Sequence, residues 1–217
     1  ADVFVENFKP GRMAALGLDY ATLKLENPEL IYASHKGFLS GPYEKRLALD
    51  EVVQMMAGLA YMTGPVGRPL RAGSSVNDIM GGMFGALGVL AALFQRNHTH
   101  TGKEVQSALF ENCVLLSAQH MQQYIVTGQA AAPMPERISA WGIYDTFELA
   151  GGEQMFIAAT GDAQWKTLCE IVGRPDLHAD IRLASNNDRV LARDWLIPEL
   201  RITLKQFDGA RLAQEFE

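Results

Sequence analysis

A single carboxylate, Asp78, stands at the start of a long apolar segment. It is the only charged residue between Arg71 and Arg96, and residues 79–94 after it are uncharged, mostly apolar and rich in glycine. The letters SSVN before it are typical of a helix start, because such side chains accept hydrogen bonds from first-turn amides. Asp78 is therefore either a cap or first-turn residue stabilised by the helix dipole, or a covalent nucleophile. The local pattern alone favours the cap.

The amides at this helix start bear on the charge of Asp78. They are expected to favour its ionised form and to stabilise an oxyanion formed beside it. The glycines add a second observation, because Gly81, Gly85, Gly88 and Ala92 recur at intervals of three and four residues and share one helix face. Each interior glycine costs about 0.5 to 1 kcal/mol relative to alanine. Their number predicts tight packing of that face or a bound ligand.

Basic side chains on predicted loops are the second group of residues that could have a functional role. Lys9, Arg12, Lys36, Lys45 and Arg46 are each explained by a solvated surface, but together they can meet a phosphorylated ligand. The sequence contains neither GxGxxG nor GxxxxGK[ST], so a standard dinucleotide or P-loop site is not supported. It also lacks GxSxG, which leaves a serine hydrolase without support.

Composition excludes several other classes. The 217 residues are 48% hydrophobic with a net charge of -6, which suits a globular core and argues against a nucleic-acid partner. The histidines are scattered, and Cys113 and Cys169 show no metal-ligand spacing, so we predict no metal and a reducing, cytoplasmic location. The apolar run 79–94 is shorter than the roughly 20 residues of a membrane span. It predicts a buried helix and no membrane association.

The hydrophobic pattern predicts an α/β chain with two parts. In the first part we expect strands at 2–7 and 30–37 and helices at 20–27, 49–62, 75–96 and 103–128, the last with a beginning that also fits a strand. A hairpin at 143–160 and helical segments at 162–173 and 187–207, broken or started at Pro198, follow. The domain boundaries are then 1–128 for a large domain, 129–141 for a linker and 142–217 for a small α+β domain. The chain has no leading Met and stops inside a helical pattern, which predicts an internal section of a longer protein.

Six blocks of sequence, in order, resemble the class III CoA-transferases, the family of formyl-CoA transferase that also contains carnitine CoA-transferase and the acyl-CoA racemases. They are ADVFVENFKPGRMAALGL, NPELIYASHKGFLSGPY, ALDEVVQMMAGLAYMTG, RAGSSVNDIMGGMFGALGVLAAL, TGKEVQSALFEN and GDAQWKTLCEIVGRPDL. The resemblance implies a Rossmann-like large domain, a smaller second domain and two chains interlocked in a homodimer. It also implies coenzyme A, as acyl-CoA, and a small, dicarboxylic acid as substrates, with no metal.

The family's catalytic aspartate falls on Asp78. In the family this carboxylate attacks the acyl-CoA thioester, and an aspartyl anhydride and an aspartyl-CoA thioester follow in turn. A carboxylate suits this exchange because it is both a nucleophile and a good leaving group. The local pattern favours a cap, whereas the resemblance favours a catalytic nucleophile at Asp78.

The family's CoA contacts are implied at two segments. The first is the turn that contains Asn7, Phe8 and Lys9, and the second is Leu47, Ala48, Leu49 and Asp50. Two basic positions of the family are Ala15 and Leu47 here, and Arg12, Lys45 and Arg46 are the adjacent cations that can replace them.

Two alternatives to CoA transfer stay open. An α-methylacyl-CoA racemase or epimerase is the first, although the histidine that racemases carry before the aspartate of the LD pair is Leu49 here, which leaves no evident base. A non-catalytic CoA-binding dimer scaffold is the second. The glycine-rich loop that closes over the active site of formyl-CoA transferase is not visible around APMPERISAWG.

Overall fold

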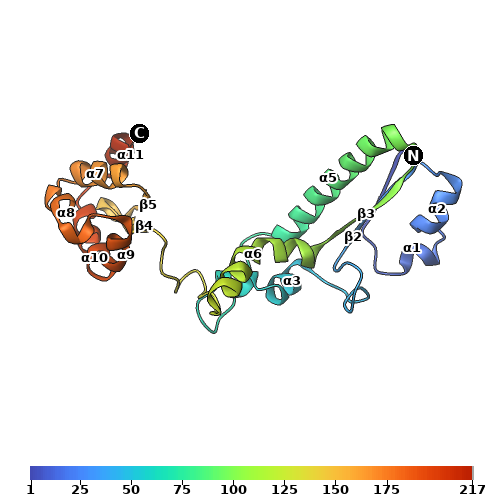
Figure 1. Cartoon of the computed structure of the whole chain (residues 1–217), viewed down its shortest axis with the longest axis horizontal. Coiled ribbons are helices and arrows are strands. Elements are labelled where there is room, and N and C mark those ends of the chain that lie inside the picture. Colours follow the sequence, from blue (N-terminus) through green and yellow to red (C-terminus); the bar gives the residue numbers. More distant parts are fainter. Residues whose placement is uncertain (217) are drawn as a thin grey trace. The chain divides into compact units, whose positions relative to one another are not determined.

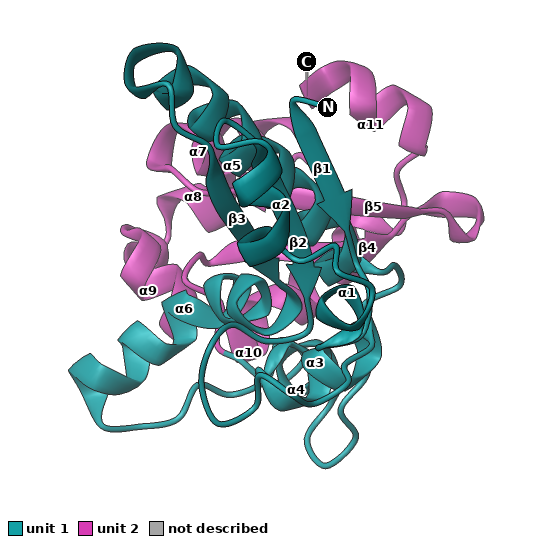
Figure 2. Ribbon diagram, turned by 90° about the vertical axis from the view of Figure 1, so that its right-hand side faces the viewer, with its two compact units in different colours: residues 1–137 teal, residues 138–217 magenta. Residues whose placement is uncertain are grey.

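The computed structural model describes residues 1–216 and divides into two compact units, Ala1–Arg137 and Ile138–Glu217. Figure 1 shows the elements in chain order, and Figure 2 colours the two units separately. Each unit contains its own sheet, with three strands in unit 1 and two in unit 2, and its own helices. The predicted mixed α/β class is confirmed.

Unit 1 is built on a parallel sheet in the order β1-β2-β3. Its strands are β1 (Val3–Glu6), β2 (Ile31–Lys36) and β3 (Lys103–Ala108). Its helices are α1 (Arg12–Ala15), α2 (Tyr20–Glu26), α3 (Asp50–Met56), α4 (Leu59–Thr63), α5 (Val76–Thr99) and α6 (Leu109–Thr127). In the register His35 pairs with Ser107 and Lys36 with Ala108, so the carboxyl ends of β2 and β3 lie at one edge. Asp19 caps α2, because its side chain accepts a hydrogen bond from the Thr22 amide at 3.2 Å.

The glycine face of α5 packs against the sheet. A Cβ on Gly88 would lie 2.6 Å from Cγ1 of Val105 on β3, and one on Gly85 would overlap the His35 ring on β2. Figure 1 shows α5 running alongside β3. The prediction of tight packing on this face is therefore confirmed, because missing side chains let the helix backbone approach the strands.

Gly88→Ala is expected to lower the free energy of unfolding by about 1 kcal/mol, because overpacking against Val105 exceeds the gain in helix propensity. Gly82→Ala in the same helix is the matched control, since nothing lies within 4 Å of its added Cβ. It is expected to raise that free energy by up to about 1 kcal/mol. Urea unfolding of both variants checks this. Equal effects of the two substitutions would contradict the packing described here.

The rest of α5 differs from the prediction of a buried helix. Large apolar side chains outside the glycine face are exposed within unit 1, among them Met83, Leu87, Leu90 and Phe94. The helix has 24 residues and extends beyond the apolar run, so its length and composition, unlike those of residues 79–94 alone, would suffice to cross a membrane. The expectation of burial holds only for the face that contacts the sheet.

Two other expectations about elements were wrong in detail, and a third that the sequence had left open, between strand and helix, is decided by the structure. The helix predicted at 49–62 is two helices, because Gly58 adopts a left-handed φ of 89° between them. The beginning of the segment 103–128 is a strand, since residues 103–108 pair with β2 along their whole length. Pro198 neither starts nor breaks a helix but lies inside α10 (Arg193–Leu204).

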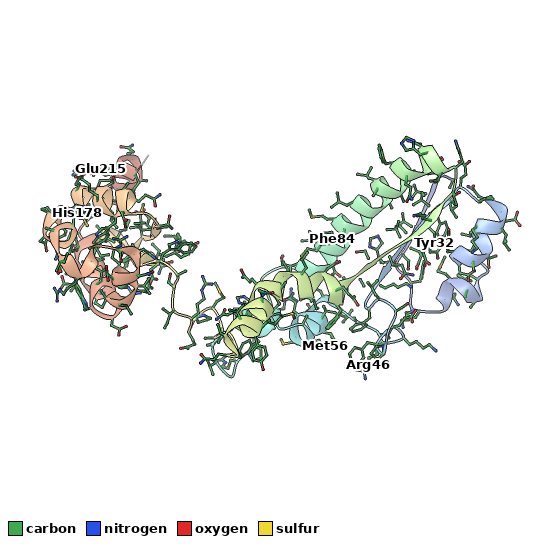
Figure 3. All side chains as sticks on the ribbon, viewed as in Figure 1. Tyr32, Arg46, Met56, Phe84, His178 and Glu215 are labelled. Atoms are coloured by element: carbon green, nitrogen blue, oxygen red, sulfur yellow. The ribbon has the colours of Figure 1, made fainter. Side chains whose placement is uncertain are left out.

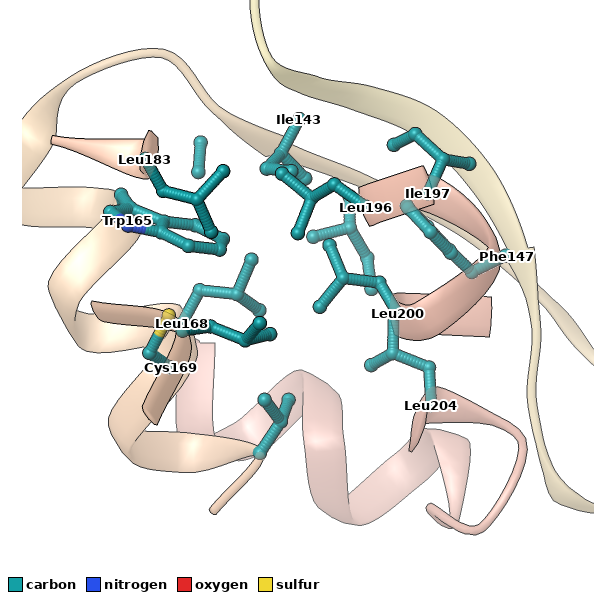
Figure 4. Close-up of a cluster of buried hydrophobic side chains, with 14 of the residues drawn as sticks. Ile143, Phe147, Trp165, Leu168, Cys169, Leu183, Leu196, Ile197, Leu200 and Leu204 are labelled. Carbon is teal, nitrogen blue, oxygen red and sulfur yellow. The ribbon is translucent and has the colours of Figure 1, made fainter. Parts of the chain in front are cut away.

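Unit 2 folds around its own apolar core. A hairpin of β4 (Ile143–Glu148) and β5 (Gln154–Ala159) is confirmed, with antiparallel pairing. The helical elements are η1 (Ala150–Gly152), α7 (Asp162–Ile171), α8 (Pro175–Ala179), η2 (Ile181–Leu183), α9 (Asn186–Leu191), α10 and α11 (Gly209–Phe216). Figure 4 shows the core, in which Leu196, Leu200 and Leu204 of α10 and Phe147 of β4 belong to one buried cluster. The four-residue spacing places these leucines on one helix face.

Candidate functional site

Asp78 lies in the first turn of α5, at the third helical position. Ser75 occupies the cap position, but its side chain makes no capping hydrogen bond. The Asp78 side chain is open to solvent within unit 1 and lines a cavity. The predicted first-turn position of Asp78 is therefore confirmed, while the role of cap belongs to another residue.

Asp50, the first residue of α3, caps α5 from outside that helix. Its Oδ2 accepts hydrogen bonds from the amides of Asn77, at 2.7 Å, and Asp78, at 3.2 Å. These second and third helical positions are the two that a cap side chain ordinarily serves. Gln54 donates to Asp50 Oδ1 and accepts from the Ala72 amide at 2.7 Å, which ties the cap to the loop before α5. Asp50 is only 3% exposed.

This arrangement changes the electrostatics expected for Asp78. Burial and the Asp50 carboxylate both raise the pKa of Asp78 above its ordinary value, with burial the larger cause. The cavity side of Asp78 is open, but the protein atoms around its base remove part of its hydration. The expectation that helix amides favour ionised Asp78 is wrong, because two of those amides are occupied by a neighbouring carboxylate. The same two amides already donate to Asp50 and therefore do not stabilise an oxyanion.

A cavity of about 1180 Å³ opens beside Asp78 in unit 1. The carboxyl ends of β1 and β2, the turn after β1, the loop before α3 and the start of α5 form its wall. It brings together most of the residues predicted to contact CoA, namely Asn7, Phe8, Lys9, Arg46, Leu47, Ala48 and Leu49. Arg12 and Asp50 do not belong to this lining. The cavity thus brings two segments, about 40 residues apart in the sequence, next to the candidate nucleophile Asp78.

Aromatic contacts hold the loop between β2 and α3. The ring centroid of Phe38 lies 5.6 Å from that of Phe110 on α6 and 5.7 Å from that of Tyr43. The guanidinium of Arg46 stacks over Tyr43 at 4.4 Å, and the loop is visible around the Arg46 label in Figure 3. A Cβ on Gly37 would lie 2.6 Å from the Ala48 Cβ, so glycine permits this close return of the loop. These contacts position Arg46 at the cavity wall.

The cavity also contains residues that the sequence did not single out. His35 lies on its wall with its ring beside Gly85, and Ser107 donates a hydrogen bond to the Gly81 carbonyl at 2.9 Å. Tyr32 on β2, labelled in Figure 3, and Glu104 on β3 complete this side. The signal that could have found His35 and Ser107 is their place near the carboxyl ends of parallel strands, where ligands of α/β sheets bind.

Among residues 1–216, no group of three or more His, Cys, Asp or Glu side chains is arranged to hold a metal ion. Both cysteines are free and buried, and burial raises the pKa of each thiol, that of Cys169 to about 12. The cavity lining itself contains carboxylates, an imidazole and cationic side chains.

Comparison with known proteins identifies the family to which the chain belongs. All of residues 1–217 match the model of CoA-transferase family III. The chain is 35% identical to the acetyl-CoA:oxalate CoA-transferase of Acetobacter aceti over 97% of this chain and 54% of that protein. It is 37% identical to a succinyl-CoA:mesaconate CoA-transferase of Haloarcula hispanica over 100% of this chain and 56% of that protein. The chain thus spans about half the length of these curated relatives.

Solved structures agree with the sequence comparison. The crystal structure of a CAIB/BAIF family protein from Brucella suis matches with a TM-score of 0.83 and 34% identity, over 100% of this chain and 57% of that one. A crystal structure from Mycobacterium tuberculosis matches with a TM-score of 0.85 and 31% identity, over 100% and 57%. The resemblance drawn from the six sequence blocks is confirmed, and the chain belongs to CoA-transferase family III.

Proposed function

We propose that the protein transfers CoA between an acyl-CoA and a small dicarboxylic acid, with Asp78 as the covalent nucleophile. The observation that carries the proposal is the place of Asp78, which lines the same cavity as the Asn7 turn and the loop at 46–49. The two relatives named above, which act on oxalate and mesaconate by their names, support the class of acid. The cavity exceeds the roughly 300 to 1,000 Å³ of ordinary small-molecule pockets, which suits a ligand as long as CoA.

The first half of the exchange loads CoA onto Asp78. A carboxylate oxygen of Asp78 attacks the thioester carbonyl, so that a C–O bond forms, the C–S bond breaks and CoA leaves as a thiolate. The thiolate then attacks the Asp78 carbonyl carbon, and the donor acid leaves as a carboxylate. The products of this half are free donor acid and an aspartyl-CoA thioester.

The second half repeats these steps with the acceptor. A carboxylate oxygen of the acceptor attacks the aspartyl-CoA carbonyl and expels the CoA thiolate, which leaves a mixed anhydride on Asp78. The thiolate attacks the acceptor's carbonyl carbon, and Asp78 leaves as a free carboxylate. No proton is needed at any step, because every nucleophile and leaving group is an anion.

The raised pKa of Asp78 has consequences for this chemistry. Nucleophilic attack needs the ionised carboxylate, so the rate of acylation should fall as the pH drops through the raised pKa. The acid side of the activity profile is thus expected at a higher pH than an ordinary aspartate would give. Above the raised pKa the carboxylate is ionised, and because it is more basic than an ordinary aspartate it is also the better nucleophile.

Cations on the cavity wall are proposed to bind the anionic parts of the substrates. Lys9→Ala and Arg46→Ala should each raise KM for acyl-CoA about tenfold with a smaller change in kcat, because each removes a charged hydrogen-bond donor. Lys45→Ala is the matched control, since Lys45 is adjacent to Arg46 but does not belong to the lining. Steady-state kinetics over a range of acyl-CoA concentrations measures all three. An equal effect of Lys45→Ala would contradict the assignment.

A racemase remains the second candidate because of His35. Leu49 replaces the family base, but the cavity holds an imidazole that the sequence had not placed there. Incubation with acyl-CoA and an isotopically labelled dicarboxylic acid separates the functions. Transfer predicts label in the CoA ester, whereas racemisation predicts deuterium uptake from D₂O at the α-carbon without label transfer. A binding scaffold predicts neither result.

Several family-level expectations accompany this proposal. The Rossmann-like large domain, the interlocked homodimer and the cytoplasmic location stay predictions. The absence of a metal cofactor and of membrane or nucleic-acid partners likewise stays a prediction. The linker at 129–141 also stays a prediction, and the boundary between the two compact units falls at residues 137 and 138.

A further inference from the structure

We propose that Asp50 is a positioning residue for Asp78, which clamps the first turn of α5 and drives the nucleophile toward its covalent states. This inference rests on the proposed function. It starts from the two hydrogen bonds that Asp50 Oδ2 accepts from the amides of Asn77 and Asp78. Since one of the two donors is the nucleophile's own backbone, the clamp fixes the point from which the Asp78 side chain extends.

The clamp is itself firmly held. Asp50 is buried on α3, and Gln54, which is fully buried one turn later, donates to its second oxygen. Gln54 in turn accepts from the Ala72 amide, so the start of α3 and the loop that leads into α5 are joined. Val53 of α3 and Ala57, which directly follows α3, pack against Cys113 of α6 in a small apolar cluster, which anchors the helix that carries the clamp.

Asp50 is also a negative charge beside the nucleophile. When Asp78 is ionised the two carboxylates repel each other, and this repulsion is one of the two causes of the raised pKa of Asp78. Conversion of Asp78 to an anhydride or a thioester removes its charge and with it the repulsion. Asp50 therefore raises the free energy of the free carboxylate relative to both covalent intermediates.

The other titratable groups near α5 do not supply this effect. His35, Lys36 and Glu104 share the cavity wall with Asp78, but none of them contributes to the shift in its pKa. On α3, Glu51 is exposed and pairs with Arg71.

Two titratable groups of α6, Glu111 and Cys113, also leave the pKa of Asp78 unchanged. Glu111 accepts a hydrogen bond from the Leu39 amide at 3.2 Å, and burial raises the pKa of Cys113 and so keeps its thiol neutral. The charge that acts on Asp78 is thus the one that also holds its backbone.

The test compares three variants of the intact protein. Asp50→Asn removes the charge but keeps one oxygen that can accept the α5 amides. Asp50→Glu keeps the charge on a longer side chain. Glu51→Gln is the matched control, because it removes a carboxylate from the next residue of the same helix without contact to the α5 start. For each, single-turnover acylation is followed from low to neutral pH, and the fraction of covalent Asp78 adduct is measured by mass spectrometry at fixed concentrations of acyl-CoA, CoA and donor acid.

We expect Asp50→Asn to move the acid side of the profile to lower pH and to lower the adduct fraction several-fold. Asp50→Glu should keep the wild-type profile at a reduced Tm, and Glu51→Gln should match wild type in both measurements. A purely structural role would lower the rates without moving the profile.

The outcomes separate this inference from the proposed function. Wild-type adduct together with an unshifted Asp50→Asn profile overturns the role of Asp50 and leaves CoA transfer intact. A folded Asp50→Glu protein whose acid side also moves to lower pH overturns it independently of whether Asp50→Asn folds, because the charge is retained. If wild type forms no Asp78 adduct at any pH, the proposed function itself fails, and the inference fails with it.

Discussion

Asp78→Asn is expected to lower the rate of CoA transfer by about 10⁴-fold or more, because the amide has nearly the same shape but no nucleophilic oxygen. The first turn of α5 should remain in place, since its amides bind Asp50 and not the Asp78 side chain. Initial rates of label transfer from dicarboxylic acid to CoA ester measure the loss.

The same variant should be at least as stable as wild type. The pKa of Asp78 is raised in the folded state, so its ionisation disfavours folding; this cost is fully present above the raised pKa, declines as the pH falls through it, and vanishes below the ordinary pKa of an aspartate. At neutral pH, asparagine removes the cost. Thermal unfolding at pH 7 checks this expectation.

The control for this variant is Glu44→Gln, which removes another carboxylate from the cavity lining. It should change the rate less than tenfold, because Glu44 has no covalent role in the proposed mechanism. A residual activity of Asp78→Asn similar to that of the control would contradict the nucleophile assignment.

Asp162→Ala is expected to cost about 2 kcal/mol of stability, less than the roughly 3 to 5 kcal/mol of a fully buried pair because Asp162 is exposed. Its partner Arg189 is completely buried, donates to the Leu183 carbonyl at 2.9 Å and lies over the Trp165 ring. In the native protein the Arg189 guanidinium lies 2.5 Å from the Asp162 carboxylate. Removal of Asp162 leaves this buried cation without its counter-ion. Urea unfolding measures the change.

Two comparisons make the Asp162 prediction specific. Glu170→Ala breaks an exposed pair with Lys166 and should cost no more than about 0.5 kcal/mol. Combining Asp162→Ala with Arg189→Met should restore part of the loss, because methionine fills similar space without a charge. If Asp162→Ala equals the exposed control, the buried guanidinium does not contribute as described.

Local signals predicted the start of α5 correctly. The letters SSVND placed Asp78 in a first turn, and the glycine spacing predicted close packing on one face. Capping and helix periodicity act over a few residues, so one segment of sequence contains the information. The family resemblance singled out the turn at 7–9 and the loop at 47–50 as expected CoA contacts, but the assembly of residues 7–9 and 46–49 into one cavity needed the fold.

Contacts between distant segments could not be predicted. The cap of α5 comes from Asp50, 28 residues before Asp78, and no local pattern identifies such a donor–acceptor pair. The expected direction of the Asp78 pKa shift was wrong because burial, and after it the Asp50 carboxylate, raise this pKa. His35 reached the cavity through the pairing of β2 with β3, and the same pairing made a strand of a segment whose hydrophobic pattern also fits a helix.

Oxygen exchange into Asp78 tests the central claim most directly. In the proposed mechanism the acceptor's carboxylate oxygen becomes the bridging oxygen of the second anhydride and remains on Asp78 when the new CoA ester leaves. A single turnover of the intact protein with acyl-CoA and an ¹⁸O-labelled dicarboxylic acid should therefore place one ¹⁸O in the peptide that contains Asp78, as read by mass spectrometry. Efficient CoA transfer with no ¹⁸O in that peptide would contradict the account.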